Sequence, residues 1–313
     1  MDRHQVTVIG AGTMGHGLAV QFARMDQDVT LVDHRESNLE HARTQIRDAV
    51  SFLNEQRLAE VSPESILDRI DFTTDRAEGV STADIVLETV SEDLAVKHEV
   101  FEAVANAAPA EAILATNTSG LRISDIATGV PDHADRIVGC HWWNPPYLMP
   151  LVEVVQGDET ADSTVDRTMA FVRSVGRDPI RVNADVPGFV WNRIQFAVLR
   201  EAMHIVESGI ASLEDVDRAV RDGYALRTAT VGPFETVDLS GLDLFRSIAE
   251  ELYPHLCNDG EPASLLDEYI EVGRNGVADG AGFYEYDEAP ADVVRNRDER
   301  IAAIRRSLAG LDD

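Results

Sequence analysis

The chain has 313 residues, of which 56 are Asp or Glu and 27 are Lys or Arg, so its formal net charge is −29. Nucleic acids and anionic membranes attract cationic surfaces, so neither is an expected partner of this chain. Hydrophobic residues make up 44% of the sequence, which excludes the composition of a disordered protein and predicts a soluble globular one. At this length we expect two domains.

The sequence carries no sign of a membrane span or of secretion. No run of about 18 apolar residues occurs, and a strand-like pattern begins at Gln5, so we predict neither a transmembrane helix nor a signal peptide. The two cysteines, Cys140 and Cys257, are too few for a disulfide framework or a four-thiolate zinc site. We therefore expect a cytoplasmic protein, and no spacing of potential ligands predicts a metal site.

Lysine is almost absent from the sequence. Lys97 is the single lysine, and all other positive side chains are arginines or histidines. A chain rich in carboxylates and poor in lysine fits a protein that stays soluble in molar salt, where the Debye length falls to about 3 Å and self-repulsion is screened. We predict a halophilic source; the alternative is an acidic enzyme from an ordinary cytoplasm.

The first predicted elements carry a nucleotide-binding pattern. A strand at Gln5–Gly10 leads into Gly10-x-Gly12-x-x-Gly15, which opens a helix, and the next strand, Asp28–Val32, ends at Asp33. Such glycines allow the backbone to approach a pyrophosphate at the helix N-terminus, and the acidic residue completes a dinucleotide site. The candidate cofactor-binding residues are Gly10, Gly12, Thr13, Met14, Gly15 and Asp33. Asp33 would bind ribose hydroxyls and repel a 2′-phosphate, so we expect NAD rather than NADP; the alternative is a glycine-rich turn without a ligand.

Strands and helices alternate over the next part of the chain. A long polar helical stretch is predicted at 38–60, and helices are predicted at Leu94–Ala107 and Ser163–Val175. The further predicted strands are Ile70–Thr73, Ile85–Glu88, Ile113–Thr116, Ile137–Cys140, Leu151–Val155 and Ile180–Val182. Such alternation predicts an α/β fold with a doubly wound, mostly parallel sheet.

The character of the sequence changes at Val186. Helical periodicity dominates from there on, with Gly or Pro at the joins. The predicted helices are 189–207, 213–222, 241–252, 262–272 and 290–308. We place the boundary near Asp185, so residues 1–185 form a nucleotide-binding domain and residues 186–313 an all-helical domain.

A histidine and a glutamate lie on two consecutive predicted strands. His141 follows the strand Ile137–Cys140, at the edge where an open α/β sheet binds its ligands. Glu153 shares one face of the strand Leu151–Val155 with apolar residues, where a carboxylate is costly unless it is paired. A carboxylate partner fixes the tautomer of a histidine and helps it accept a proton. We predict a catalytic pair; the alternative for His141 alone is a structural histidine.

Two more polar segments point to the same edge of the sheet. Asn117-Thr118-Ser119-Gly120 directly follows the strand Ile113–Thr116, and Asn192 lies in the first helical turn after Val186-Pro187-Gly188. Taken alone, Asn-Thr-Ser is more often a helix cap than a catalytic loop. Its position at a strand end, like that of His141, makes Ser119 and Asn192 candidate site residues.

The neighbours of His141 are expected to be packing residues. Cys140 ends an apolar strand, which favours a packed thiol over a nucleophile. Trp142 and Trp143 are expected to pack at the rim of the cleft rather than to stack on bases.

Several stretches of the sequence together resemble the 3-hydroxyacyl-CoA dehydrogenase family. They cover nearly the whole chain and are Gly10-A-G-T-M-Gly15, Glu88-T-V-S-Glu92-D-L-A-V-Lys97, Thr116-N-T-S-Gly120, Gly139-C-H-W-W-N-P-P, Leu151-V-E-V-V, Pro187-G-F-V-W-N-R, Gly232-P-F-Glu235 and Gly282-F-Y-E-Tyr286. The resemblance implies a Rossmann domain with NAD as cofactor, followed by an all-helical domain through which the family forms dimers. A homodimer is therefore expected.

The resemblance also implies roles for single residues. The catalytic dyad of the family corresponds to His141 and Glu153, and the residues that contact the reacting oxygen or position the histidine correspond to Ser119 and Asn192. The cofactor contacts correspond to Glu92, Lys97 and Asn117. Lys97 is thus a lysine retained at the cofactor position of a nearly lysine-free chain; the alternative is a chance survivor on a solvated helix.

Two stretches narrow the resemblance. His141-x-x-Asn-Pro-Pro-Tyr-x-x-Pro-Leu-Val-Glu and Asp222-G-Y-A-L-Arg227-T-A-T-V-Gly232 resemble the branch that holds lambda-crystallin, L-gulonate 3-dehydrogenase and carnitine dehydrogenases. Members that act on acyl-CoA commonly lack an arginine at the position of Arg227, which would bind a substrate carboxylate bidentately. The alternative is a surface arginine without a role. Those members also tend to carry lysines after the second strand, near the CoA phosphates, where this chain has only arginines among acidic residues.

The resemblance implies the reversible, NAD-dependent oxidation of a 3-hydroxyl to a 3-ketone. His141 would take the hydroxyl proton, and Glu153 would stabilise the imidazolium. We expect a 3-hydroxyacyl-CoA as the substrate and hence a role in fatty acid metabolism. The first alternative is a free 3-hydroxy acid of the gulonate or carnitine type, and the second is a catalytically silent, crystallin-like protein that binds a dinucleotide.

Overall fold

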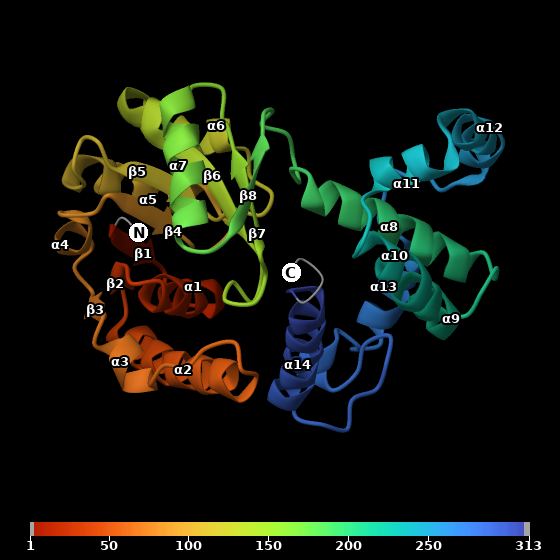
Figure 1. Ribbon diagram of the computed structural model, residues 1–313, viewed down its shortest axis with the longest axis horizontal. Coiled ribbons are helices and arrows are strands. Elements are labelled where there is room, and N and C mark those ends of the chain that lie inside the picture. The colour runs from red at the N-terminus through yellow and green to blue at the C-terminus, as the bar shows by residue number, and fades with distance from the viewer. Residues whose placement is uncertain (1–2, 310–313) are drawn as a thin grey trace. The chain divides into compact units, whose positions relative to one another are not determined.

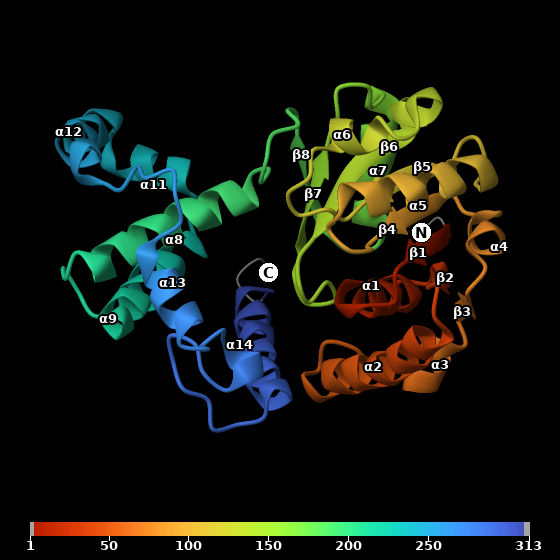
Figure 2. The same ribbon diagram turned by 180° about the vertical axis from the view of Figure 1, so that it is seen from behind.

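We describe residues 3–309 of the protein from a computed structural model (Figures 1 and 2). The chain divides into two compact units. The first unit holds the residues up to Asn192 together with those from Val294 onward, and the second holds Arg193–Val293. None of the helices within residues 3–309 combines the length and the apolarity that crossing a membrane requires.

An eight-stranded sheet organises the first unit. Its strands lie in the order β3-β2-β1-β4-β5-β6-β7-β8. All neighbouring pairs are parallel except β6 and β7, which are antiparallel. The strands are β1 (Gln5–Ile9), β2 (Asp28–Val32), β3 (Ile70–Thr73), β4 (Ile85–Glu88), β5 (Ile113–Thr116), β6 (Ile137–Trp142), β7 (Leu151–Val155) and β8 (Asp178–Val182). The predicted fold class is confirmed.

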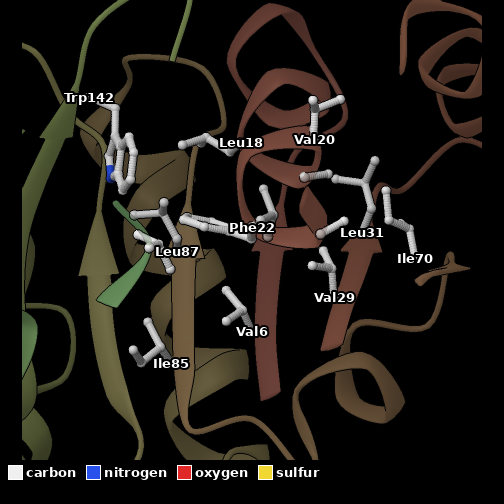
Figure 3. Close-up of a cluster of buried hydrophobic side chains, with 14 of the residues drawn as sticks. Val6, Leu18, Val20, Phe22, Val29, Leu31, Ile70, Ile85, Leu87 and Trp142 are labelled. Atoms are coloured by element: carbon white, nitrogen blue, oxygen red, sulfur yellow. The ribbon is translucent and has the colours of Figure 1, made fainter. Parts of the chain in front are cut away.

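Helices cover both faces of this sheet. They are α1 (Thr13–Arg24), α2 (Glu36–Glu55), α3 (Pro63–Leu67), α4 (Arg76–Val80), α5 (Leu94–Ala107), α6 (Ile123–Ala127), a 3-10 turn at Pro131–Arg136 and α7 (Asp162–Ser174). Successive residues of a strand point to opposite faces. Ile85 and Leu87 of β4 therefore pack in the cluster with α1, α2 and α7, whereas Val86 packs in the cluster with α4, α5 and α6. Figure 3 shows part of the first cluster, in which the rings of Phe22 and Trp142 meet edge to face.

The last helix, α14 (Pro290–Ala309), belongs mainly to the first unit. Ala302 is fully buried in the apolar cluster of α1 and α2. Arg305 donates a hydrogen bond to the carbonyl of Leu148, and Arg306 donates one to the carbonyl of Gln56. The sequence predicts a single boundary near Asp185, whereas the contacts place most of α14 in the first unit together with the sheet. The reason is that α14 follows the helical unit in the chain but buries its apolar face in the first unit.

The second unit is helical, apart from isolated bridges that join Gly276, Ala281 and Glu285. Its elements are most of α8 (Trp191–Glu207), α9 (Leu213–Arg218), a π-helical segment at Ala219–Ala225, α10 (Leu226–Thr228), α11 (Pro233–Ser240), α12 (Leu242–Leu252), a 3-10 turn at Tyr253–His255, α13 (Ser264–Glu271) and a second 3-10 turn at Val277–Asp279. The predicted all-helical character of this region is confirmed.

Candidate active site

The loop Gly10–Gly15 joins β1 to α1 and leaves room over the N-terminus of the helix. Gly10 has a φ of 104°, and a Cβ on Gly15 would meet the carbonyl oxygen of Gly10 at 1.7 Å, so both positions need glycine for the fold itself. A Cβ on Gly12, in contrast, would meet nothing within 4 Å. This open space at a helix N-terminus fits the pyrophosphate of a dinucleotide.

Asp33 lies beside this loop, directly after β2. One oxygen of its buried carboxylate accepts a hydrogen bond from the amide of Ala11 at 2.9 Å. The other oxygen accepts from the amide of Arg35 and from the side chain of Asn38. The carboxylate is therefore fixed next to the glycine loop, at the place where it would meet an adenosine ribose.

Lys97 is buried, not solvated as the alternative interpretation held. Its side chain on α5 is 1% exposed, and Nζ lies 2.8 and 3.0 Å from the two carboxylate oxygens of Glu88. Nζ also lies 3.4 Å from Glu92. Glu88 ends β4, is fully buried and accepts a further hydrogen bond from Thr116 at 2.7 Å. Lys97 therefore pairs with Glu88 at the end of β4 and, more distantly, with Glu92 in the loop that follows, and its contact with a cofactor stays a prediction.

Glu92 holds the loop that follows β5. One oxygen of its side chain accepts hydrogen bonds from the hydroxyl of Thr118 and from the amides of Ser119 and Gly120. Partial burial alone would raise the pKa of Glu92, but the hydrogen bond from Thr118, the charge of Lys97 and the two amides hold it below its usual range. Glu92 thus acts as an anionic anchor for this loop.

Asn117 connects the same loop to the strand of the histidine. Its side-chain oxygen accepts a hydrogen bond from the amide of Trp142 at 2.7 Å, and its side-chain nitrogen lies 3.5 Å from the hydroxyl of Thr89. The ends of β4, β5 and β6 are thereby tied together by one amide side chain.

His141 and Glu153 form the predicted pair. They face each other across the antiparallel strands β6 and β7, with Nδ1 of His141 at 2.8 Å from Oε2 of Glu153. Both side chains are at most 5% exposed. Because Nδ1 faces the carboxylate, the ring is held in one tautomer and Nε2 is left to exchange a proton with a substrate.

The second oxygen of Glu153 links the pair to the start of α8. It accepts hydrogen bonds from the amides of Val190 and Trp191, each at 2.9 Å. Burial would raise the pKa of Glu153, but the hydrogen bonds from His141, Trp191 and Val190 hold it below its usual range. The next residue, Asn192, donates from its side chain to the carbonyl oxygen of Ser119 at 2.9 Å. The structure therefore connects all four predicted catalytic residues through hydrogen bonds and adjacent backbone.

Aromatic rings surround the histidine. Phe189 lies 5.8 Å from His141 between ring centroids, and Trp143 stacks on Trp191 with centroids 4.4 Å apart. Phe189 has a φ of 49°, which is rare for a residue with a side chain. Phe189 and Trp191 stand in the stretch Pro187-G-F-V-W-N-R that carries the resemblance, but no physical pattern pointed to a role for either. The buried Glu88, at the end of an apolar strand, carried the same signal as Glu153.

Of the three neighbours of His141 that were expected to be packing residues, Cys140 and Trp142 lie in the core. Cys140 is buried, and burial raises the pKa of its thiol to about 12, so it is not a nucleophile near neutrality. Trp142 is 2% exposed, lies in the core and donates from its indole toward the sulfur of Cys140. Cys140 is therefore the packed thiol that the sequence predicted, whereas Trp142 lies in the core against Phe22 and not at the rim of a cleft.

Arg227 lies in the other compact unit. It is on α10, its residue is exposed, and it makes no ion pair with any residue between 3 and 309. Its role toward a substrate therefore stays a prediction.

Comparisons with known proteins agree with this arrangement. Residues 5–186 match the family model of the NAD-binding domain of 3-hydroxyacyl-CoA dehydrogenase, and residues 188–286 match that of its C-terminal domain. The mitochondrial hydroxyacyl-coenzyme A dehydrogenase of Homo sapiens is 34% identical and aligns over 90% of each chain. The L-carnitine dehydrogenase of Streptomyces griseus is 33% identical over 99% of this chain and 91% of its own.

A solved structure also matches the whole chain. It is that of 5-formyl-3-hydroxy-2-methylpyridine 4-carboxylic acid 5-dehydrogenase, described as an NAD+-dependent dismutase. The two chains are 33% identical, each is covered to 99%, and the TM-score is 0.91.

Proposed function

Because this chain belongs to the 3-hydroxyacyl-CoA dehydrogenase family, whose members are NAD-dependent dehydrogenases, we propose that it reversibly oxidises a 3-hydroxyl group to a 3-ketone. The observation that carries the proposal is the buried contact of 2.8 Å between Nδ1 of His141 and Glu153. It provides a general base of fixed orientation at the ligand-binding edge of the sheet.

Each side chain has a definite task in this reaction. The loop Gly10–Gly15 and Asp33 would hold NAD, which supplies the acceptor of the substrate's hydride when bound. Nε2 of His141 takes the hydroxyl proton, and the negative charge of Glu153 stabilises the imidazolium that forms. Asn192 and Ser119, joined by their hydrogen bond, orient the reacting oxygen.

We further propose that the substrate is a free hydroxy acid, and we keep the CoA ester as the second candidate. Helix α14 lies beyond residue 286, where the match to the family models ends. It packs against the end of α2, where Arg295 pairs with Glu55 and lies over the ring of Phe52. Helix α14 thus packs against the segment after the second strand in which acyl-CoA members tend to carry lysines near the CoA phosphates. This packing disfavours CoA and favours a free acid as the substrate.

Other observations favour the same choice. In that segment Arg43 lies 3.6 Å from the ring centre of Phe72 and pairs with Glu40, so its charge is already engaged. One of the solved structures that match the full chain is that of a dehydrogenase of a carboxylic acid, and another is that of a 3-hydroxyacyl-CoA dehydrogenase. The CoA ester is supported by the family itself and by the human relative. Arg227, which has no carboxylate partner within the described residues, would bind the carboxylate of a free acid.

A panel assay in molar KCl tests both parts of the proposal. It compares NADH-dependent reduction of acetoacetyl-CoA with NAD-dependent oxidation of free 3-hydroxy acids. We expect the higher kcat/KM with a free acid. A preference for the CoA ester would contradict the proposed free-acid substrate but not the proposed oxidation of a 3-hydroxyl group. NADH binding without turnover of any compound would indicate the crystallin-like alternative.

A variant of Arg227 sharpens this test. Loss of a charge-assisted pair costs about 1.5–3 kcal/mol, so Arg227→Ala should raise the KM for a free acid by about 10- to 100-fold and leave that for a CoA ester unchanged. The matched control is Arg221→Ala, which removes an exposed arginine paired with Asp222. An equal effect of Arg227→Ala on both substrate classes would contradict the role of this residue.

We propose that a second copy of the chain covers the apolar surface of α11 and α12, so that the protein is a homodimer. Leu244, Ile248 and Leu252 recur every four residues on α12 and are all exposed, and Phe234 on α11 is 86% exposed. Sedimentation in molar KCl should give a dimer. Ile248→Glu should give a monomer, and Glu250→Gln on the same helix should not; a wild-type monomer would contradict the proposal.

A further inference from the structure

A cluster of three potential metal ligands lies in the second unit, outside the proposed catalytic residues. His204 lies on α8, and Cys257 and Asp259 follow the 3-10 turn at Tyr253–His255. One donor atom from each of the three lies within 4.8 Å of the other two. Sequence spacing did not reveal this cluster, because His204 is 53 residues before Cys257 and meets Cys257 and Asp259 only through the fold.

The spacing within the cluster suits a tetrahedral ion. Sγ of Cys257 and Oδ2 of Asp259 are 3.5 Å apart. Two ligands of a tetrahedral zinc ion, bound at about 2.0–2.3 Å, are themselves about 3.5 Å apart. This pair therefore already has the separation that zinc requires, and a small rotation of side chains would bring His204 to the same separation.

Contacts that do not involve the ligand atoms hold the two segments together. The carboxylate of Glu201, one turn before His204 on α8, accepts a hydrogen bond from the amide of Cys257 at 2.8 Å. Arg200 donates from its side chain to the carbonyl oxygen of Asp259 at 3.3 Å. The ligands are thus positioned by the backbone of the loop before any ion binds.

Charge and access are also suitable. A thiolate and a carboxylate cancel the two positive charges of a zinc ion, and a neutral imidazole completes a set of sulfur, oxygen and nitrogen donors. Asp259 is exposed, whereas His204 and Cys257 are half-buried. The ion would therefore have an entry route from solvent and partly shielded ligands.

We propose that His204, Cys257 and Asp259 bind one zinc ion, with water in the fourth position, and that the ion cross-links α8 to the loop after α12. As the sulfur–zinc bond forms, the thiol of Cys257 releases its proton to solvent. Glu201 is a positioning residue that holds the loop. The site stabilises a helical unit in which few apolar side chains are fully buried.

Titration of the full chain with Co2+ tests the proposal, because cobalt replaces zinc and absorbs light when it binds a thiolate. Protein freed of metal with a chelator should bind one Co2+ per chain with a thiolate charge-transfer band, and Zn2+ should displace it. The band reports on Cys257, because the other cysteine, Cys140, is sealed in the core. Zinc should also raise the Tm of the metal-free protein.

Variants assign the ligands. Cys257→Ser should abolish the band, His204→Gln should abolish stoichiometric binding, and Glu201→Gln should weaken binding by about 10- to 100-fold. The matched controls are His255→Gln and Glu261→Gln, which change exposed residues of the same region and should bind as the wild type does. A wild-type protein without the band, or Cys257→Ser that retains zinc affinity, would overturn the site; the wild-type result decides if a variant fails to fold.

Discussion

The carboxylate of Glu153 sets the positions of several groups in the proposed active site. One oxygen faces His141, and the other accepts hydrogen bonds from the amides of Val190 and Trp191. Because Asn192 follows Trp191 directly, the same contacts that hold the imidazole also place the amide that bonds to the loop at Ser119. A change at this single position should therefore disturb base, orienting amide and loop together.

A substitution of His141 is the most direct test of the proposed proton transfer. His141→Gln keeps a polar side chain of similar reach but removes the proton acceptor, so turnover should fall by about 100- to 10,000-fold. NADH binding, measured by fluorescence titration, should be retained, because the glycine loop and Asp33 are untouched. Unchanged turnover would rule out His141 as the base.

The lowered pKa of Glu92 gives a stability change with a definite sign. A carboxyl group whose pKa is lower in the folded protein stabilises the fold above its ordinary value of about 4.3 and loses that contribution as pH falls through the folded pKa. The wild type should therefore be more stable than Glu92→Gln near neutrality, and the difference should shrink below about pH 4.

Thermal unfolding from neutral to acid pH in molar KCl measures this difference. Glu99→Gln is the matched control, because it changes an exposed glutamate on α5, the helix that begins two residues after Glu92. A difference between wild type and Glu92→Gln that stays constant over the whole range would contradict the assigned interaction.

Lys97 and Glu88 should be coupled energetically. Lys97→Met leaves the buried carboxylate of Glu88 without its main partner, which costs about 3–5 kcal/mol. The double variant Lys97→Met with Glu88→Gln removes both charges and should recover a large part of this loss. Urea unfolding in molar KCl measures the cycle, and purely additive effects would show that the two charges do not interact.

At the scale of elements, α14 places one small apolar residue in the core of the first unit. Ala302 is fully buried, so Ala302→Leu should overpack the contact and cost about 1–3 kcal/mol. The neighbouring Ala303 is exposed, and Ala303→Leu should stay within about 0.5 kcal/mol of the wild type. Thermal unfolding compares the two, and equal stability would mean that α14 does not pack on the sheet unit in solution.

The elements that the sequence predicted best are the buried strands. β4, β5 and β7 begin and end as predicted, because strands covered on both faces have nearly continuous apolar runs. β2 and the partly exposed edge strand β3 also have the predicted bounds. The helices α3, α4 and α6 have five residues each, too few to show a period, and were not predicted. The helix predicted at 38–60 ends at Glu55, because Arg57 takes a φ of 57°.

The site residues that the sequence predicted are those whose polar side chains interrupt or directly follow an apolar strand. His141 and Glu153 were found because a polar group in an apolar strand needs a partner. The pairing of Lys97 with Glu88 and the contacts of α14 with α2 depend on packing between segments that no periodicity relates. The helix predicted at 213–222 also differs from the structure. There the helical conformation continues past Asp222, in a π-helical segment at Ala219–Ala225.

At the scale of the whole molecule, the structure shows which residue types carry the positive charge on the described surface. The single lysine of the chain is 1% exposed, so the positive charges on the described surface come from arginine and histidine. Such a surface, in a chain of net charge −29, agrees with the predicted adaptation to high salt.

This charge predicts how the fold depends on salt. The Debye length is about 3 Å in 1 M salt and about 30 Å in 0.01 M salt, so dilution exposes the carboxylates to one another over most of the molecule. We expect ellipticity and NADH turnover to be lost together on dialysis from molar to millimolar KCl. Sucrose, an uncharged osmolyte that favours compact states without screening charge, is the control and should restore little of either. Full activity and cooperative unfolding in low salt would contradict the halophilic interpretation, because the self-repulsion would then be too weak to unfold the protein.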